Sequence, residues 1–439
     1  MRDDIKKRIE AVRLGEVPEG YSCGMAGVLP NDWACMPLSE ISVPITEQVG
    51  NRTIETLSIS AGIGFVNQAE KFGKELSGKQ YEKYIVLRRG DFAYNKGNSK
   101  SYPQGCTYML REREEAAVPN VFECFRFTQG HSAYYEHLFK NGFLNRQLTR
   151  KINHGVRDDG LLNLTDKDFY STVLPVPPDE EQKRIAEVLS SCDRVIELKQ
   201  KLVEELRQLK KICLAKMFPQ KGCTTPEIRF PGFTNPWEQR KLGELARLHG
   251  RIGFRGYTQK DIITKDEGGI LTFSPSNIIG NQLDLYAKNT YITQAKYDES
   301  PDIKIKNGDI LFVKTGSTLG KSALVTGLSE PASINPQIVV IRTKSELRQF
   351  LSTQLVSDLI QAQVAAVKIG GAVPTMTETE IKDLDILVPV DSDESAVLGD
   401  FFSDLDSLIT HHQCELEEVQ QKKKALMQLL LTGLVRVND

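Results

Sequence analysis

Residues 316–322 (GSTLGKS) come closest to a nucleotide-binding loop. Such a loop needs the pattern GxxxxGK[ST] between a strand and a helix, so that backbone N–H groups and the helix N-terminus enclose phosphate. Thr315 stands where the first glycine is required, and the following ALVTG has the residue types of a strand. We therefore predict a β-hairpin loop, whose Gly, Ser, Thr and Lys residues suit contact with a phosphate backbone or a base edge.

Two further motifs are incomplete. Residues 62–67 (GIGFVN) begin like a dinucleotide-binding loop but lack its third glycine and a following βαβ unit, which predicts a turn. Residues 335–337 (NPQ) partly match an amino-methyltransferase motif, but Gln337 and Ile338 stand where that motif has a second proline and an aromatic residue. A Gly-rich loop for S-adenosylmethionine is also missing. We therefore predict that the chain has no catalytic or cofactor-binding residues of its own.

A metal site is equally unexpected. The eight cysteines lie far apart, and His411 and His412 are the only close histidine pair. Adjacent residues on a helix point in different directions, so these two histidines are poor ligands for one ion. The cysteine pattern indicates reduced, cytoplasmic thiols rather than a disulfide framework. The N-terminus carries no apolar signal segment, and no stretch of sequence approaches the length of a membrane span.

Basic residues are concentrated in two segments of a chain whose net charge is only −2. Residues 79–157 contain fourteen Lys and Arg against seven acids, and residues 240–344 contain fifteen against ten. Charge runs alone are usually solvated faces. In Gly-, Asn-, Ser- and Thr-rich loops, however, they fit phosphate positioning, with Asn, Gln and Arg reading base edges. The candidate DNA-contacting residues are Arg88, Arg89, Asn95, Lys96, Asn98, Lys100, Arg150, Lys151, Arg157, Arg251, Arg255, Lys314, Ser317, Thr318, Lys321 and Lys368.

Two long heptad segments must position these loops. Residues 179–218 recur at 391–432, and at a shift of 213 positions nine residues coincide. Apolar residues at alternating steps of three and four predict two coiled-coil helices. Capping boxes are expected at the two starts, pairing Asp179 with Gln182 and Asp391 with Glu394. The stripe residues of the two helices include Ile185, Leu189, Ile196, Leu206, Leu398, Phe402, Ile409 and Val419.

Polar residues interrupt both stripes at matching places. Lys199 and Lys210 fall within the first stripe, and His412 and Lys423 within the second. Polar residues at core positions trade stability for a unique register, so we expect the two helices to pair with each other, antiparallel, within one chain. A homo-oligomeric coiled coil is the alternative.

The segments before each helix echo one another. Each has a Trp followed by a Leu-x-Glu-[Ile/Leu] motif that we expect to start a strand, a Gly-Asp pair before a β-rich run, and a Thr-led helix start near its end. The predicted class is α+β, with two mixed α/β domains separated by two long antiparallel helices. The expected parts are a short N-terminal helix (1–17), a first mixed domain (18–178), a helix (179–218), a linker (219–236), a second mixed domain (237–390) and a second helix (391–434).

This order of parts resembles the specificity subunit of type I restriction–modification systems, in which two target recognition domains alternate with two conserved helical regions. The resemblance covers essentially the whole chain. It is carried by residues 229–245 (RFPGFTNPWEQRKLGEL), 308–316 (GDILFVKTG) and 333–341 (SINPQIVVI), and by the helix starts LPVPPDEEQKRIAEVL and ILVPVDSDESAVL.

The resemblance implies a non-catalytic DNA-binding subunit that recognises an asymmetric, bipartite site in double-stranded DNA. Two methyltransferase subunits would dock on the two helices, whose stripe residues named above would be the partner-binding ones, and restriction subunits would complete the complex. S-adenosylmethionine, ATP and Mg would bind those partners, and an adenine in each half-site would be flipped into a partner's pocket. Two alternatives remain open: a related system whose nuclease and methyltransferase are fused in one partner, and a coiled-coil scaffold with protein-binding end domains.

Overall fold

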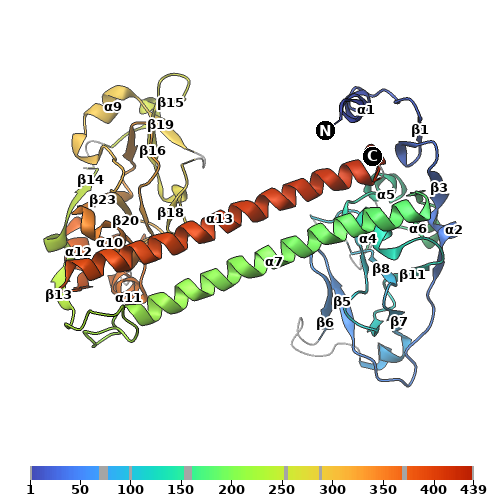
Figure 1. Cartoon of the computed structure of the whole chain (residues 1–439), viewed down its shortest axis with the longest axis horizontal. Helices are drawn as coiled ribbons and strands as arrows, with labels where there is room; N and C mark the ends of the chain where they lie inside the picture. Colours follow the sequence, from blue (N-terminus) through green and yellow to red (C-terminus); the bar gives the residue numbers. More distant parts are fainter. Residues whose placement is uncertain are drawn as a thin grey trace. The chain divides into compact units, whose positions relative to one another are not determined.

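The computed structural model describes residues 2–68, 78–97, 101–152, 161–251, 256–285, 289–367 and 373–437. The chain forms two compact units, of which the first contains Met1–Lys199 and Glu415–Asp439 and the second Gln200–Cys414. Each unit contains one mixed domain and a part of each long helix, α7 (Asp179–Met217) and α13 (Ser392–Leu430) (Figure 1). The predicted α+β class and the two long helices are confirmed.

The long helices pair antiparallel in each unit. In the first unit Lys423 Nζ donates to Asp193 Oδ1, and Lys199 Nζ donates to Glu415 Oε2 at 2.9 Å. In the second unit Lys210 Nζ donates to Asp406 Oδ1 at 2.5 Å. The predicted pairing within one chain is thus confirmed.

The helix starts differ from the expected capping boxes. Gln182 donates to the Pro177 carbonyl and accepts a hydrogen bond from the His131 N–H. Glu394 is fully buried and bound by Arg229 and Trp237. Both capping boxes were therefore wrong, because each side chain is held by residues far away in the sequence. Asp391 does accept a hydrogen bond from the Asp393 N–H at 2.9 Å.

The first mixed domain is built around a four-stranded antiparallel sheet in the order β4-β11-β8-β9. Its aromatic core also takes in Ile185 and Leu189 of α7 and Met427 and Leu430 of α13. Short ladders pair β1 with β2, β3 with β12, β5 with β6, and β7 with β10. The elements are α1 (Asp3–Arg13), β1 (Tyr21–Gly24), β2 (Gly27–Pro30), β3 (Ala34–Pro37), α2 (Leu38–Ile41), β4 (Ser42–Pro44), β5 (Leu57–Ser60), β6 (Gly64–Asn67), η1 (Gly78–Lys83), β7 (Ile85–Arg88), β8 (Phe92–Asn95), β9 (Cys106–Met109), β10 (Glu115–Val118), β11 (Glu123–Phe127), α4 (Ser132–Lys140), α5 (Asn145–Lys151), α6 (Asp166–Tyr170) and β12 (Val173–Val176).

The second mixed domain has a six-stranded sheet in the order β14-β23-β20-β21-β18-β17 and a four-stranded sheet in the order β15-β19-β16-β22. One core cluster joins the larger sheet to Met217 of α7 and to Leu398 and Phe402 of α13. The elements are β13 (Glu238–Lys241), α8 (Leu242–Leu245), β14 (Ala246–Gly250), η3 (Gln259–Asp261), β15 (Ile262–Ile263), β16 (Ile270–Phe273), η4 (Pro275–Asn277), β17 (Ile278–Ile279), β18 (Gln282–Leu283), β19 (Thr290–Ile292), α9 (Gln294–Asp298), η5 (Pro301–Ile303), β20 (Ile310–Val313), β21 (Ser322–Leu324), β22 (Ala332–Ile334), β23 (Ile338–Thr343), η6 (Ser345–Leu347), α10 (Arg348–Gln354), α11 (Asp358–Val367), α12 (Glu378–Lys382) and β24 (Asp385–Val388).

The sequence motifs shared by the two mixed domains form equivalent structural elements. In each, the strand after the Trp pairs with the strand before the long helix, β3 with β12 and β13 with β24. The Leu-x-Glu-[Ile/Leu] motifs do not start strands but form the one-turn helices α2 and α8. Leu38 and Ile41 explain this, since residues three apart share one side of a helical turn and both are buried. The Thr-led starts are confirmed, with Thr165 and Thr377 accepting hydrogen bonds as N-caps of α6 and α12.

None of the helices among the described residues is long and apolar enough to cross a membrane.

Candidate functional site

A buried carboxylate organises each loop-bearing strand. Asp91, just before β8, accepts two hydrogen bonds from Arg126 of β11, at 2.6 and 2.7 Å. Asp309, just before β20, accepts two from Arg342 of β23, both at 3.0 Å. In both units the arginine lies on the neighbouring strand, so the Gly-Asp motifs fix the strands that lead into the basic loops. These arginines are therefore structural.

The predicted hairpin loop in the second unit is confirmed. Residues 314–321 join β20 to β21, which pair antiparallel. Leu319 is 3 % exposed and anchors the loop in the core, and Gln361 of α11 donates to the Gly320 carbonyl at 3.0 Å. Gly320 has φ +92°, and an added Cβ would lie 2.9 Å from the Gln361 side chain, so the close approach requires glycine.

This loop borders a hollow of about 330 Å³. Asn281 reaches it from the two-residue turn between β17 and β18, where Gly280 and Asn281 have φ of 57° and 64°. Among the described residues that line it, none has an acidic or aromatic side chain. Its polar residues are Asn281, Ser317, Thr318, Lys321 and Gln361. The structure therefore brings three of the predicted contact residues together with two that sequence reasoning missed.

Several predicted contacts in the first unit are engaged in ion pairs. Arg88 Nη1 lies 2.6 Å from Glu47 Oε2, and Arg89 Nη2 lies 2.7 Å from Glu114 Oε1. Hydrogen bonds from Arg88 lower the pKa of the Glu47 carboxyl. Because both pairs are exposed, water and DNA can compete for these arginines.

Lys96 is held more firmly. Its Nζ lies 2.6 Å from Asp166 and 3.3 Å from Glu123, and its side chain is 15 % exposed. The hydrogen bond from Lys96 lowers the pKa of Asp166, whereas burial raises the pKa of Glu123. Lys96 therefore ties the start of α6 to the sheet. This gives it a structural role that the charge count did not reveal.

The other predicted residues of the first unit are differently placed. Asn95 Oδ1 accepts a hydrogen bond from the Gly97 N–H at 2.8 Å, and Lys151 Nζ donates to Ser171 Oγ at 2.7 Å. Arg150 is exposed, and within the described chain nothing binds its guanidinium. Asn98, Lys100 and Arg157 lie outside the described residues.

In the second unit Arg251 is buried, at 3 % exposure. It donates to the Ile334 carbonyl at 3.0 Å and to Ser333 Oγ at 2.9 Å, and burial lowers its pKa. Arg251 thus supports the sheets, and we give it no DNA contact. Lys314 is half-buried at the end of β20. Arg255 and Lys368 lie outside the described residues.

The stripe residues predicted as partner-binding face inward. Ile185, Leu189, Leu398 and Phe402 are at most 2 % exposed and belong to the cores of their own units. Ile196, Leu206, Ile409 and Val419 are partly buried. These side chains hold α7 and α13 to the rest of the chain, so their apolar surface is largely unavailable to another subunit.

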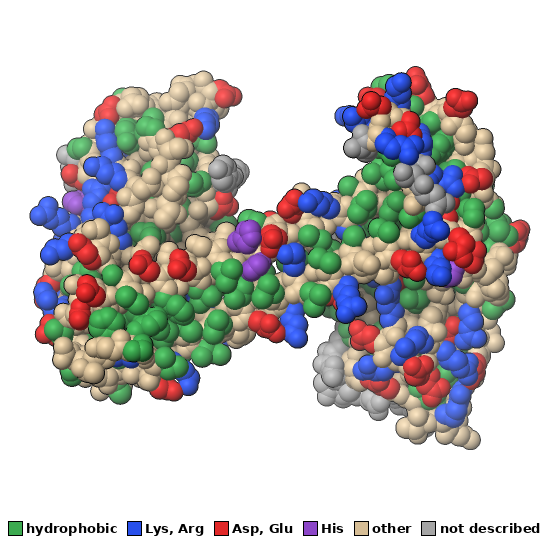
Figure 2. All heavy atoms as spheres, in the orientation of Figure 1, with side chains coloured by type: hydrophobic (Ala, Val, Ile, Leu, Met, Phe, Trp, Pro, Cys, Tyr) green, Lys and Arg blue, Asp and Glu red, His purple; other side chains and the backbone are tan. Residues whose placement is uncertain are grey.

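A different set of apolar residues on α7 is exposed. Val188, Val195, Leu202 and Leu209 recur every seven residues and are 36 to 46 % exposed, and Ile212 is 52 % exposed. In the second unit Figure 2 shows hydrophobic side chains gathered over this helix. The sequence contained this signal, because the seven-residue spacing of these apolar positions of α7 can be read directly from it.

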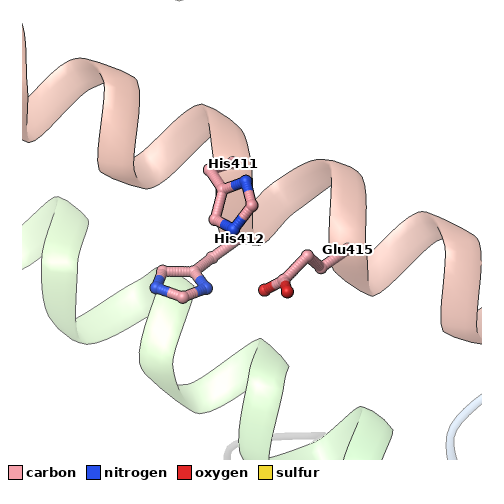
Figure 3. Close-up of side chains that lie close together, drawn as sticks. All are labelled: His411, His412 and Glu415. Carbon is pink, nitrogen blue, oxygen red and sulfur yellow. The ribbon is translucent and has the colours of Figure 1, made fainter.

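His411, His412 and Glu415 place their ligand atoms within 4.8 Å of one another on α13 (Figure 3). The two histidine rings therefore lie closer together than we expected for adjacent residues on a helix. Lys199 Nζ already lies 2.9 Å from Glu415 Oε2. Since that carboxylate has a cationic partner, we assign no metal to the cluster.

A buried glutamate near the start of each long helix is bound by a Trp and an Arg. Trp33 Nε1 donates to Glu181 at 2.9 Å, and Arg436 of the C-terminal tail donates to both of its carboxylate oxygens. The second unit repeats this arrangement around Glu394, with Trp237 at 3.3 Å and Arg229 of the linker at 2.6 and 2.7 Å. Each cluster fixes the start of a long helix against its own mixed domain.

Comparison with known proteins gives consistent results. The model of the family described as "Type I restriction modification DNA specificity domain" matches residues 129–208 and 234–421. The chain is 25 % identical over 316 residues to the type I restriction enzyme MjaVIII specificity subunit of Methanocaldococcus jannaschii, covering 70 % of each chain.

Solved structures show the same fold. One is the type I restriction–modification system S subunit from M. genitalium, with a TM-score of 0.57 at 12 % identity, covering 91 % of this chain and 96 % of that one. Another comes from a study of complex assembly and conformational transition of the type I R-M system. Its TM-score is 0.50 at 16 % identity, covering 93 % of this chain and 99 % of that one.

Proposed function

Because the chain belongs to the family of type I restriction–modification specificity subunits, we propose that it recognises a bipartite, asymmetric site in double-stranded DNA. It positions methyltransferase and restriction subunits on that site. Each mixed domain reads one half-site, and the long helices set the number of base pairs between the halves. We assign no catalytic step to this chain.

The observation that carries the proposal is the repetition of one supporting plan around different loops. Both units place a buried Asp, paired with an Arg of the neighbouring strand, before the loop-bearing strand and a Trp–Glu–Arg cluster at the start of a long helix. The loops themselves differ. In the first unit β8 ends at Asn95 and is followed by Lys96, whereas in the second a hollow lined by Ser317, Thr318 and Lys321 follows β20. Like supports with unlike loops predict two unlike half-sites at a fixed spacing.

Two methyltransferase subunits are the proposed partners of the helices. The exposed heptad positions of α7, from Val188 to Ile212, support this, because a repeating apolar stripe suits packing against another helix. The equivalent stripe on α13, shifted by 213 positions, contains Phe401, Leu408 and Ala425 but turns polar at Glu415 and Lys422. We therefore expect the two docking contacts to differ in detail.

Chemistry belongs to the partners in this proposal. S-adenosylmethionine would bind the methyltransferase subunits, and ATP and Mg the restriction subunits. The adenine to be methylated would be flipped out of the duplex into a partner's pocket. All eight cysteines of the chain are free thiols, in keeping with a role beside DNA in the cytoplasm.

Sequencing of methylated adenines tests the proposal. The chain would be expressed with its methyltransferase subunits in a host that lacks other adenine methylation. We expect one motif with two unequal halves and a spacer of constant length. A palindromic or uninterrupted motif would contradict two unlike reading domains. Absence of methylation, together with DNA binding that hardly changes with salt, would favour the scaffold alternative.

A further inference from the structure

We infer that the hollow beside the β20–β21 loop binds a phosphate of the DNA backbone, not a base. This inference rests on the proposed function and extends it, because it assigns a positioning role to Lys321 and its neighbours. Sequence reasoning had left phosphate and base edge as equal alternatives for this loop.

Several hydrogen-bond donors around the hollow have no partner among the described residues. Lys321 is exposed, and in the part of the chain that the structure describes its Nζ has no hydrogen bond or ion pair. The backbone N–H groups of Ser317 and Thr318 likewise have no partner among the described residues, and both side chains add a hydroxyl. Phosphate oxygens only accept hydrogen bonds, so this set of donors suits phosphate.

The lining lacks what a base needs. Pockets for a flipped or unpaired base stack it against an aromatic side chain, and base edges offer both donors and acceptors. The described lining has no aromatic ring, and Gln361 Nε2 already donates to the Gly320 and Leu355 carbonyls, which leaves that side chain only its Oε1. The part of the lining that the structure describes also has no carboxylate to repel an anion, since Asp358 at the start of α11 lies outside it.

Packing and hydrogen bonds hold the loop in place. Leu319 is buried in the core, the Gly316 N–H donates to the Pro374 carbonyl at 2.9 Å, and the Lys321 N–H donates to the Thr318 carbonyl at 3.1 Å. A site fixed in this way loses little conformational entropy on binding. It can therefore set the register of the second unit on the duplex without reading sequence.

Lys321→Gln tests the inference, with Lys321→Arg as the conservative variant. Lys344→Gln is the matched control, because Lys344 is also exposed but follows β23 at the far end of the sheet from the loop. The antiparallel register places Val313 opposite Ile338 and Ile310 opposite Ile341, with Lys344 beyond that end. Thermal unfolding of each variant checks that the unit stays folded.

Binding of the chain with its methyltransferase subunits is measured over a salt series on two labelled duplexes. One carries the mapped site, and the other has both half-sites scrambled. We expect Lys321→Gln to weaken binding to both by the same factor, roughly tenfold, and to reduce the slope of log K against log salt by about 0.9. Lys321→Arg and Lys344→Gln should bind like the wild type.

The outcomes separate the inference from the proposed function. A loss confined to the mapped duplex would overturn the phosphate assignment in favour of a base contact. No loss on either duplex would overturn the site altogether. If the wild type bound both duplexes equally, the proposed function would fail, while an equal loss in Lys321→Gln would still support the phosphate site.

Discussion

Glu181 and Arg436 form a two-bond ion pair although they lie 255 residues apart, with Arg436 Nε 2.6 Å from Glu181 Oε1 and Nη2 2.7 Å from Oε2. Arg436 also contacts Asp32, and its guanidinium lies 5.8 Å from the centre of the Trp33 ring. In the second unit the equivalent arginine, Arg229, comes from the linker that follows α7. The C-terminal tail thus supplies the arginine that binds the buried glutamate of the first unit, and the linker supplies it in the second.

Arg436→Ala should destabilise the first unit by about 3 kcal/mol, because Glu181 is 3 % exposed and would be left as a buried charge. The measurement is the thermal or denaturant unfolding of the chain. Lys424→Ala, an exposed lysine of α13, is the control and should change little. Combining Arg436→Ala with Glu181→Gln should cost less than the sum of the two changes. Strict additivity would show that the pair does not act as a unit.

His137 should make the first unit sensitive to mild acid. It is fully buried, lies 3.2 Å from Ser190 Oγ, and has Asp193, Lys140, Lys423 and Arg111 around it. Burial lowers its pKa to about 3, and the Asp193 carboxylate offsets only part of this. The native state therefore stays neutral at this residue, while the unfolded chain takes up a proton below about pH 6.5.

Stability should accordingly fall as the pH drops from 7 to 5, by about 2 kcal/mol from this residue. His137→Gln removes the titrating group and keeps a side chain that can bond Ser190. In the second unit Gln349 makes the corresponding contact with Ser403, at 3.4 Å. The variant should lose that part of the pH dependence. An unchanged slope in His137→Gln would rule out this origin.

The lysines that interrupt the stripes pair with carboxylates across the helices. A shift of 213 residues maps Asp193 onto Asp406 and Lys210 onto Lys423, so the Lys210–Asp406 and Lys423–Asp193 pairs are equivalent. Lys210→Asp should lower stability by about 1 kcal/mol or more through like-charge repulsion, and adding Asp406→Lys should restore it.

The equivalent charge exchange in the first unit, Lys423→Asp combined with Asp193→Lys, should restore less of the lost stability. Lys140 Nζ lies 3.8 Å from Asp193, and a lysine at position 193 would meet it. Thermal unfolding of the four single and two double variants measures both effects. Equal recovery in the two units would show that Lys140 does not sense the charge at position 193.

Much of this architecture was predictable because its signals are local or repeated. The heptad stripes and the broken phosphate-loop spacing around Thr315 are read from neighbouring residues. The 213-residue shift is read by comparing the two helical segments with each other. The predicted capping boxes were wrong because contacts distant in the sequence override this local signal. Gln182 and Glu394 have the expected spacing, but tertiary partners hold them, among them Arg229, 165 residues away from Glu394.

The candidate site was predictable in part. Ser317, Thr318 and Lys321 were found because a Gly-rich loop with a lysine is conspicuous. Asn281 and Gln361 were not, since only the order of strands in the sheet brings β18 beside β21. Lys96 and Arg251 were chosen from charge alone, which does not distinguish an exposed cation from one paired or buried by the fold.

Exposed heptad residues of α7 should matter for partners rather than for folding. Leu209→Glu and Ile212→Glu place a charge on side chains that are 46 and 52 % exposed, so the unfolding temperature of the chain should hardly change. Binding of methyltransferase subunits should weaken at least tenfold, because interface energy is concentrated in a few apolar side chains. Lys211→Glu, an exposed neighbour, introduces the same residue and is the control. Equal weakening by all three would point to general electrostatics.

Helix length and domain identity should be separable in the recognised site. One heptad would be inserted after Lys199 and another after Cys414, the points where each helix passes from one unit to the other. Seven residues lengthen a helix by about 10 Å, which corresponds to roughly three base pairs at ~3.4 Å each. The added turn of the duplex, roughly 100°, should reduce affinity without changing either half-site. Exchange of residues 237–390 for the second domain of another family member should change one half-site and leave the spacer length unchanged.

Sequencing of methylated adenines with both variants tests the account most directly. The account predicts that the heptad insertions keep both half-sites and lengthen only the spacer, and that the domain exchange replaces one half-site and keeps the spacer. Insertions that altered half-site sequence, or an exchange that altered only spacing, would contradict it.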